Sequence, residues 1–150
     1  MLHVRSVLGV AVGVALASLV SAASAQACQD TQRTAAVRPI TVDQLAAVME
    51  NHPGVNVIDA NGPETRAKFG IIPGAHLLSH YASYDPAKEL PADKNAILVF
   101  YCASTKCTAA PTAAKKALES GYANVYVLEV GIKGWTDAGK PTKPVANTTI

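Results

Sequence analysis

Short apolar runs alternate with amphipathic stretches along most of the chain. The runs 55–59, 97–101 and 125–128 have the length of strands, and 97–101 (ILVFY) is the most apolar. A short run with few polar interruptions is typical of a strand buried on both faces of a parallel sheet. A fourth, shorter strand is predicted at 76–78, after an Ile-Pro-Gly turn.

Helices are predicted between these strands. Thr41 and Gln44 fit a capping box, and the turn at 51–54 ends the helix that it begins. Further helices are predicted at 63–69, at Ala109–Ser120 with its alanines on one face, and at 131–139 around a core Trp135. Residues 79–94 are polar and predict a surface loop. Strands that alternate with helices indicate an α/β fold, with a central parallel sheet flanked by helices.

The first 27 residues have the pattern of an export signal. Arg5 precedes an apolar run at 7–20, and small residues follow that run. The run is shorter than the ~20 residues that span a bilayer, and the remaining chain suits one domain. The boundaries we predict are a signal peptide at 1–27, a linker at 28–38, one domain at 39–145 and a tail at 146–150. The predicted location is a bacterial periplasm.

Charge and composition exclude several classes of partner. The net charge is +2, and aromatic residues make up 5% of the chain. A nearly neutral domain has no general attraction for nucleic acid or anionic lipid, and it has few rings for base stacking. The one membrane attachment left open is a lipid anchor at Cys28. Lipoprotein signals place a Leu-like residue three positions before the cysteine, where this chain has Ala25, so soluble export is favoured.

Two further cysteines carry the candidate chemistry. Cys102 follows the strongest predicted strand, and Asp59 ends another, so both fall where parallel sheets bind ligands. The loop after Cys102 runs into a predicted helix, whose first N–H groups have no partner within the helix. A thiol at such a position has a depressed pKa and a reactive thiolate. Position alone leaves a buried structural cysteine as the alternative.

Three stretches resemble the signatures of rhodanese-like sulfurtransferase domains. They are VIDANGPETRAKFGIIPGAHLL, ILVFYCAS and AAKKALESGYANVYVLEVGIKGWTDAGKP, in the family's order over about residues 40–141. The resemblance implies the rhodanese-like fold and a catalytic Cys102. That cysteine would carry sulfur as a persulfide, from a donor such as thiosulfate to cyanide, a thiol or a protein acceptor. No metal or organic cofactor is implied.

The resemblance also assigns a substrate loop. The backbone N–H groups of this loop would hold the persulfide and a small sulfur-containing anion, with Asp59 in support. The loop residues are Ala103, Ser104, Thr105, Lys106, Cys107 and Thr108. The six members from Cys102 to Cys107 suit sulfur donors, whereas the related dual-specificity phosphatases use a loop one residue longer that ends in arginine.

Departures from the family pattern leave alternatives open. Asn61 and Ile71 stand where the family has arginine and histidine, and Thr105 replaces a loop glycine. Lys106 is either a replacement cation or a solvated lysine. Cys107 is either a helix-start cysteine facing the core or a resolving thiol.

A resolving Cys107 would make the protein a periplasmic thiol–disulfide redox protein. A third alternative is a non-catalytic sulfur carrier. A zinc site formed by His76, His80 and the two loop cysteines is disfavoured, because their spacing matches no usual ligand pattern.

Overall fold

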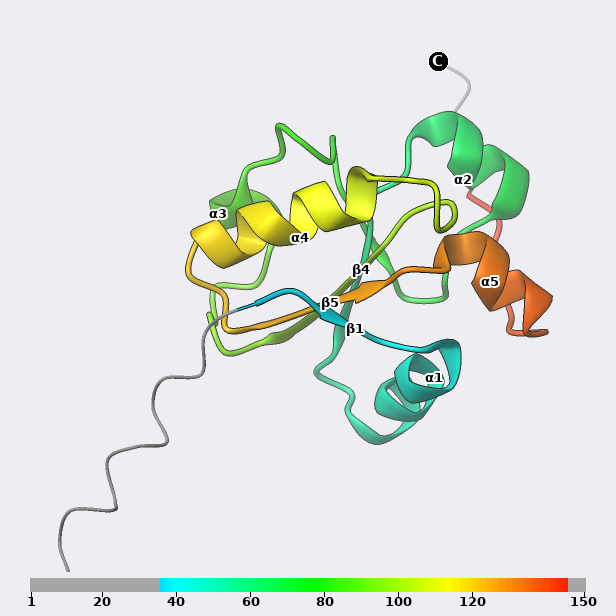
Figure 1. Cartoon of the computed structure of the whole chain (residues 1–150), viewed down its shortest axis with the longest axis horizontal. Helices are drawn as coiled ribbons and strands as arrows, with labels where there is room; N and C mark the ends of the chain where they lie inside the picture. The colour runs from blue at the N-terminus through cyan, green and yellow to red at the C-terminus, as the bar shows by residue number, and fades with distance from the viewer. Residues whose placement is uncertain (1–35, 146–150) are drawn as a thin grey trace, which may run out of the picture. The chain divides into compact units, whose positions relative to one another are not determined.

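The computed structural model describes residues 36–145, and a five-stranded parallel sheet forms its centre (Figure 1). The strand order is β1-β5-β4-β2-β3. The strands are β1 (Arg38–Pro39), β2 (Asn56–Asp59), β3 (His76–Leu77), β4 (Ile97–Tyr101) and β5 (Asn124–Leu128). The helices are α1 (Val42–Asn51), α2 (Pro63–Phe69), α3 (Pro86–Glu89), α4 (Ala109–Glu119) and α5 (Gly131–Asp137). The predicted α/β fold is confirmed.

Strand β4 lies in the middle of the sheet, as its sequence predicts. It pairs in parallel with β2 on one side and β5 on the other. The register places Tyr101 opposite both Asp59 and Leu128, so these three strands end at one edge. Cys102 therefore leaves the sheet from its centre, beside the carboxyl ends of both neighbouring strands.

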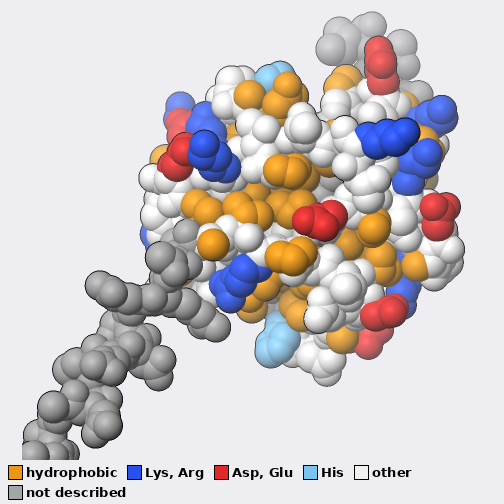
Figure 2. Space-filling view, in the orientation of Figure 1, with side chains coloured by type: hydrophobic (Ala, Val, Ile, Leu, Met, Phe, Trp, Pro, Cys, Tyr) orange, Lys and Arg blue, Asp and Glu red, His pale blue; other side chains and the backbone are white. Residues whose placement is uncertain are grey.

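Helices cover both faces of this sheet (Figure 1). The buried alanines of α4 pack on one face, against Leu98 and Phe100 of β4. Leu45 of α1 and Trp135 of α5 pack on the opposite face, in the core cluster that contains Val99. Alternate residues of β4 thus point into two separate cores, which explains why its sequence is apolar throughout. Apolar side chains also cross the face shown in Figure 2, with charged side chains mostly around them.

Local sequence signals set the bounds of the helices. At the start of α1, the backbone N–H of Gln44 donates to Thr41 Oγ1 at 3.2 Å, and Thr41 N–H donates to Gln44 Oε1 at 3.0 Å. This is the predicted capping box. Helix α2 has proline in its first turn and ends at Gly70, whose φ of +72° favours glycine.

Two predictions about loops were wrong. Arg38, assigned to the linker, belongs to β1 and pairs with Tyr126 of β5. The segment 79–94 contains α3 and is not wholly superficial, because Tyr84 is buried and donates from its hydroxyl to Ala113 O at 2.8 Å. The polar composition of this segment gave no sign of Tyr84, the buried aromatic residue whose hydrogen bond connects the segment to α4.

The predicted signal peptide, Cys28 and the tail lie outside the described residues. Within 36–145, none of the helices has the length and hydropathy needed to cross a membrane.

The buried carboxylate of Asp59, at the end of β2, connects this strand to β4 and to α2. Asp59 is fully buried at the end of β2, and its Oδ2 accepts from the Tyr101 hydroxyl at 2.6 Å. The same hydroxyl accepts from Ile72 N–H at 3.1 Å, so it links the sheet to the turn before β3. Arg66 of α2 donates to Asp59 Oδ1 at 3.4 Å and to Asp59 O at 3.0 Å. A buried charge is tolerated only with such partners.

Replacing Tyr101 with phenylalanine is expected to destabilise the fold. Tyr101→Phe removes one donor to a buried carboxylate and leaves Ile72 N–H without its acceptor, at a cost of about 1–3 kcal/mol. Urea unfolding measures this loss. Tyr126→Phe is the matched control on β5, because that side chain is only half-buried, and it should cost under about 0.5 kcal/mol. Equal unfolding midpoints for the two variants would show that the Asp59 network adds nothing to stability.

Candidate active site

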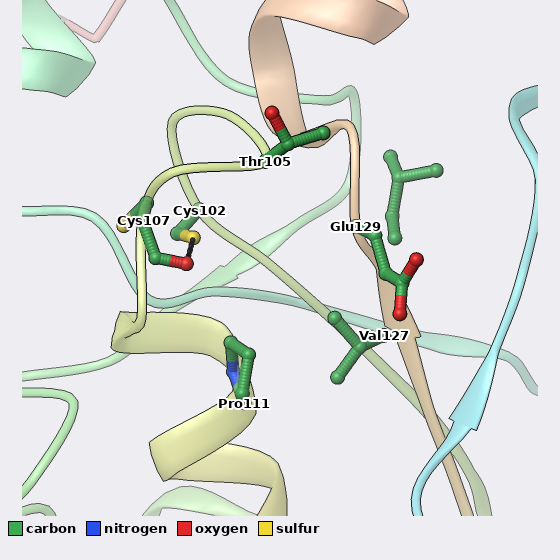
Figure 3. Close-up of a pocket in the computed structure, with 7 residues that line it drawn as sticks. Cys102, Thr105, Cys107, Pro111, Val127 and Glu129 are labelled. Carbon is green, nitrogen blue, oxygen red and sulfur yellow. Dashed lines mark hydrogen bonds between the residues drawn. The ribbon is translucent and has the colours of Figure 1, made fainter.

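Cys102 lies at the carboxyl end of β4 with only 2% of its surface exposed. The loop after it returns the chain to α4, which begins at Ala109. Within the loop, Cys107 N–H donates to Ser104 O at 2.9 Å and closes a tight turn. This turn brings Cys107 back beside Cys102, so both thiols lie between the end of β4 and the start of α4 (Figure 3).

The N-terminus of α5 clamps this loop from the other side. Ile132 N–H donates to Cys102 O at 2.8 Å, and Lys133 N–H donates to Ala103 O at 3.1 Å. Gly131 makes the approach possible: its φ is +63°, and a Cβ there would lie 2.5 Å from Cys102 O. Only glycine allows the two backbones to meet at this distance. The loop is thus held by α5 as well as by its own turn.

A cavity of about 260 Å³ opens in front of the thiols. The lining residues are Cys102, Thr105, Cys107, Pro111, Val127, Leu128 and Glu129. They come from the loop, from α4 and from the end of β5 (Figure 3). The cavity is large enough for a small sulfur compound but not for a drug-sized ligand.

The ionisation of Cys102 differs from the prediction. Burial raises the pKa of the Cys102 thiol to about 12, and its contact with Cys107 acts in the same direction. The backbone N–H groups of Ala110 and Ala103 oppose this rise without overcoming it. The prediction considered the helix N-terminus but not the burial of the sulfur, which favours the neutral thiol.

Cys107 is the more acidic thiol of the pair. Its partial burial tends to raise the pKa, but the Cys102 thiol and the N–H groups of Ala103 and Ala109 outweigh burial and lower it. Cys102 Sγ also lies 3.4 Å from Cys107 O, which accepts from it. The first thiolate of the pair therefore forms on Cys107.

The remaining predicted loop residues divide into two groups. Thr105 lines the cavity, and Ala103 directs its N–H toward the two sulfurs. Lys106 and Thr108 are exposed and do not line the cavity, and the Thr108 side chain makes no capping bond at the start of α4. The structure therefore places Lys106 as a solvated lysine at the loop surface.

Asp59 does not line the cavity, and it supports the site through contacts outside it. Its carboxylate accepts from Asn61 N–H at 2.7 Å, from Arg66 and from Tyr101, and none of these partners belongs to the loop 103–108. Tyr101 directly precedes Cys102, so Asp59 holds the strand end that carries the thiol. The guanidinium beside Asp59 comes from Arg66, seven residues away, whereas Asn61 occupies the family's arginine position.

Sequence reasoning missed two residues that shape the site. Gly131 was assigned only to the last helix, although a glycine just after a strand is a signal for close backbone approach. Glu129 follows β5 directly and lines the cavity. Its position at the carboxyl end of a strand was a usable signal, because ligands of parallel sheets bind there.

Replacing Gly131 with alanine tests the clamp. Gly131→Ala is expected to lose about 1–2 kcal/mol from its positive φ, and about 1–3 kcal/mol more from the clash with the loop. Gly139→Ala is the matched control, since its φ is +70° with nothing within 4 Å of the added Cβ. Urea unfolding compares the two. Equal losses would contradict steric contact between α5 and the loop.

The order of thiol ionisation predicts the order of alkylation. At pH 8, iodoacetamide should modify Cys107 before Cys102, because the lowered pKa of Cys107 gives it the larger thiolate fraction. Cys102→Ala removes the thiol that stabilises this thiolate, and the midpoint of Cys107 alkylation should move to higher pH. Cys102→Ser retains a donor and should move it less. Peptide mass spectrometry across pH 6–10 measures both, and a midpoint that is unchanged in Cys102→Ala would contradict the stabilisation of the Cys107 thiolate by Cys102.

Comparison with known proteins agrees with this architecture. The model of the Rhodanese-like domain family matches residues 41–138. The chain is 33% identical over 116 residues to arsenate reductase 2.1 of Oryza sativa subsp. japonica, across 68% of this chain and 69% of that one.

Two solved structures share the fold. A rhodanese-like domain protein from Staphylococcus aureus is 25% identical with a TM-score of 0.55, over 71% of this chain and 99% of that one. A thiosulfate sulfurtransferase from Pseudomonas aeruginosa is 20% identical with a TM-score of 0.59, over 72% of this chain but only 20% of that one. With a parallel sheet that delivers a cysteine to a loop at its centre, and with a family match over most of the described residues, this chain belongs to the rhodanese-like domain family.

Proposed function

We propose that this protein is an exported sulfurtransferase that carries sulfane sulfur on Cys102. The observation that most strongly supports this function is the position of the Cys102 Sγ atom. It lies at the end of the central strand, on the wall of a cavity, with the N–H groups of Ala103 and Ala110 directed at it. Amide N–H groups are the donors that stabilise an anionic sulfur at this position once a persulfide has formed. Export rests on the pattern of residues 1–27.

Cys107 has a defined part in this reaction. Cys102 attacks only as a thiolate, and burial opposes its ionisation. The Cys107 thiolate is a nearby base, since Cys102 Sγ lies 3.4 Å from the Cys107 carbonyl oxygen and the Cys102 thiol lowers the pKa of Cys107. Proton transfer from Cys102 to Cys107 therefore precedes or accompanies attack. Cys107 acts here as the general base.

Sulfur then moves in two displacements. The Cys102 thiolate attacks the outer sulfur of a donor such as thiosulfate, the S–S bond of the donor breaks, and sulfite leaves with the bonding electron pair. A thiophilic acceptor, cyanide or a thiol, next attacks the outer sulfur of the persulfide. The Cys102–sulfur bond breaks, and the thiolate is regenerated. Charge balances in each step, and no redox cofactor is needed.

A thiol–disulfide redox activity is the second candidate, because the two cysteines are adjacent, with Cys102 Sγ 3.4 Å from Cys107 O. The relative in rice bears the name arsenate reductase, and reduction of arsenate to arsenite takes two electrons. Here the two thiols would form a Cys102–Cys107 disulfide, and one arsenate would leave as arsenite and water. The cavity lining includes no arginine or lysine to hold such an oxyanion, which disfavours arsenate as a substrate.

Intact-mass analysis with thiosulfate tests the sulfurtransferase. The reduced protein should gain the mass of one sulfur and lose it when cyanide is added. Cys102→Ser should abolish this gain. Cys107→Ser should retain it at a rate lower by roughly tenfold or more near pH 7, because the base is lost.

The outcomes separate the candidates. A persulfide that survives in Cys102→Ser would overturn the assignment of Cys102. Loss of two hydrogens with arsenate, and no sulfur gain with thiosulfate, would favour the redox candidate. A persulfide that forms but is not passed to cyanide or a thiol would indicate a carrier without turnover.

A further inference from the structure

Glu129 is the one charged residue among those that line the cavity beside Cys102. It follows β5 directly, and its side chain is exposed at the cavity. The loop's cation, Lys106, does not line the same space. Any compound that enters therefore meets a carboxylate and no side-chain cation.

The other walls increase the influence of that carboxylate. Pro111, Val127 and Leu128 present apolar surface to the cavity. Apolar walls lower the effective dielectric, so a charge at such a cavity acts more strongly than one on an open surface.

The amide groups at the start of α4 do not offset the negative charge of Glu129. The N–H groups of Ala109 and Ala110 are directed at the sulfurs of Cys107 and Cys102, as is that of Ala103. They serve the sulfur that is transferred. The remainder of the donor molecule faces Glu129, Thr105 and the apolar walls.

We propose that Glu129 selects the class of sulfur donor: small persulfides that carry an ammonium group, in preference to dianionic thiosulfate. This rests on the proposed function and narrows its substrate. The sulfane sulfur of such a donor meets Cys102 while its ammonium group lies near the Glu129 carboxylate. A donor that ends in a carboxylate, or in sulfonate oxygens, meets a like charge.

The transfer is balanced without a further reactant. The Cys102 thiolate attacks the outer sulfur of the persulfide R–S–SH, and the S–S bond of the donor breaks. The thiolate R–S⁻ leaves with the electron pair, and the outer sulfur remains on Cys102 with its hydrogen. One disulfide-type bond forms as one breaks, so there is no net oxidation.

Two donors of opposite charge test this proposal. The persulfides of cysteamine and of 3-mercaptopropionate are similar in size but end in an ammonium and a carboxylate. For both donors, the reaction is quenched at successive times, and the rate of sulfur gain on Cys102 is measured by intact-mass analysis. The two leaving thiols differ in intrinsic reactivity, so the two rates are first combined into a ratio, the rate with cysteamine persulfide divided by the rate with 3-mercaptopropionate persulfide. The readout is the quotient of this ratio in wild type and in Glu129→Gln.

The expected quotient is about three to ten, from removing one unit charge near a low-dielectric cavity. It should fall toward one in 0.5 M salt, because ions screen the carboxylate. The rate with thiosulfate should rise in Glu129→Gln. Glu50→Gln, an exposed carboxylate on α1 that does not line the cavity, should leave every rate unchanged.

A quotient of one, with persulfide still formed on Cys102, would overturn the selection by Glu129 and leave the sulfurtransferase intact. Failure of every donor to place sulfur on Cys102 would overturn the proposed function, and this proposal with it. Urea unfolding of Glu129→Gln should match wild type, so that altered rates reflect charge rather than folding.

Discussion

The site depends on a backbone contact between two segments far apart in sequence. The loop that leaves β4 at Cys102 is held by hydrogen bonds from Ile132 and Lys133, at the start of α5. Gly131 lets these backbones approach, because any Cβ would lie within 2.7 Å of three loop atoms. A loop fixed by its own turn and by a neighbouring helix holds its amide groups in place beside the two sulfurs.

Burial and hydrogen bonding compete at the two thiols, and the outcome differs between them. Cys102 is almost wholly enclosed, so desolvation dominates and its pKa rises. Cys107 is only partly enclosed, so nearby donors dominate and its pKa falls. The enclosed sulfur of Cys102 therefore stays a neutral thiol to higher pH than the sulfur of Cys107.

The Asp59 network explains how the strand end is kept in place. Tyr101 spans from Asp59 on β2 to Ile72 in the turn before β3, and Arg66 neutralises the carboxylate from α2. None of these side chains lines the cavity. Their contribution is to hold the residue before Cys102 through groups that are buried and mutually satisfied.

Much of the architecture followed from local pattern. The apolar run at 97–101 predicted the central strand, the capping box of Thr41 and Gln44 predicted the start of α1, and the alanine face predicted the packing of α4. Tyr84 escaped prediction because one buried aromatic in a polar segment produces no periodic signal. Strand β1 was not predicted, because its two residues, Arg38 and Pro39, form no apolar run and follow a polar segment.

The sequence by itself determined the order of elements, the sheet type and the position of Cys102 at a strand end, because periodicity and capping act between near neighbours in the chain. Tertiary structure alone decided which thiol ionises first, that Gly131 touches the Cys102 loop, and that Glu129 rather than Lys106 meets the cavity. Desolvation and contacts between distant segments set these properties, and neither exists until the chain has folded.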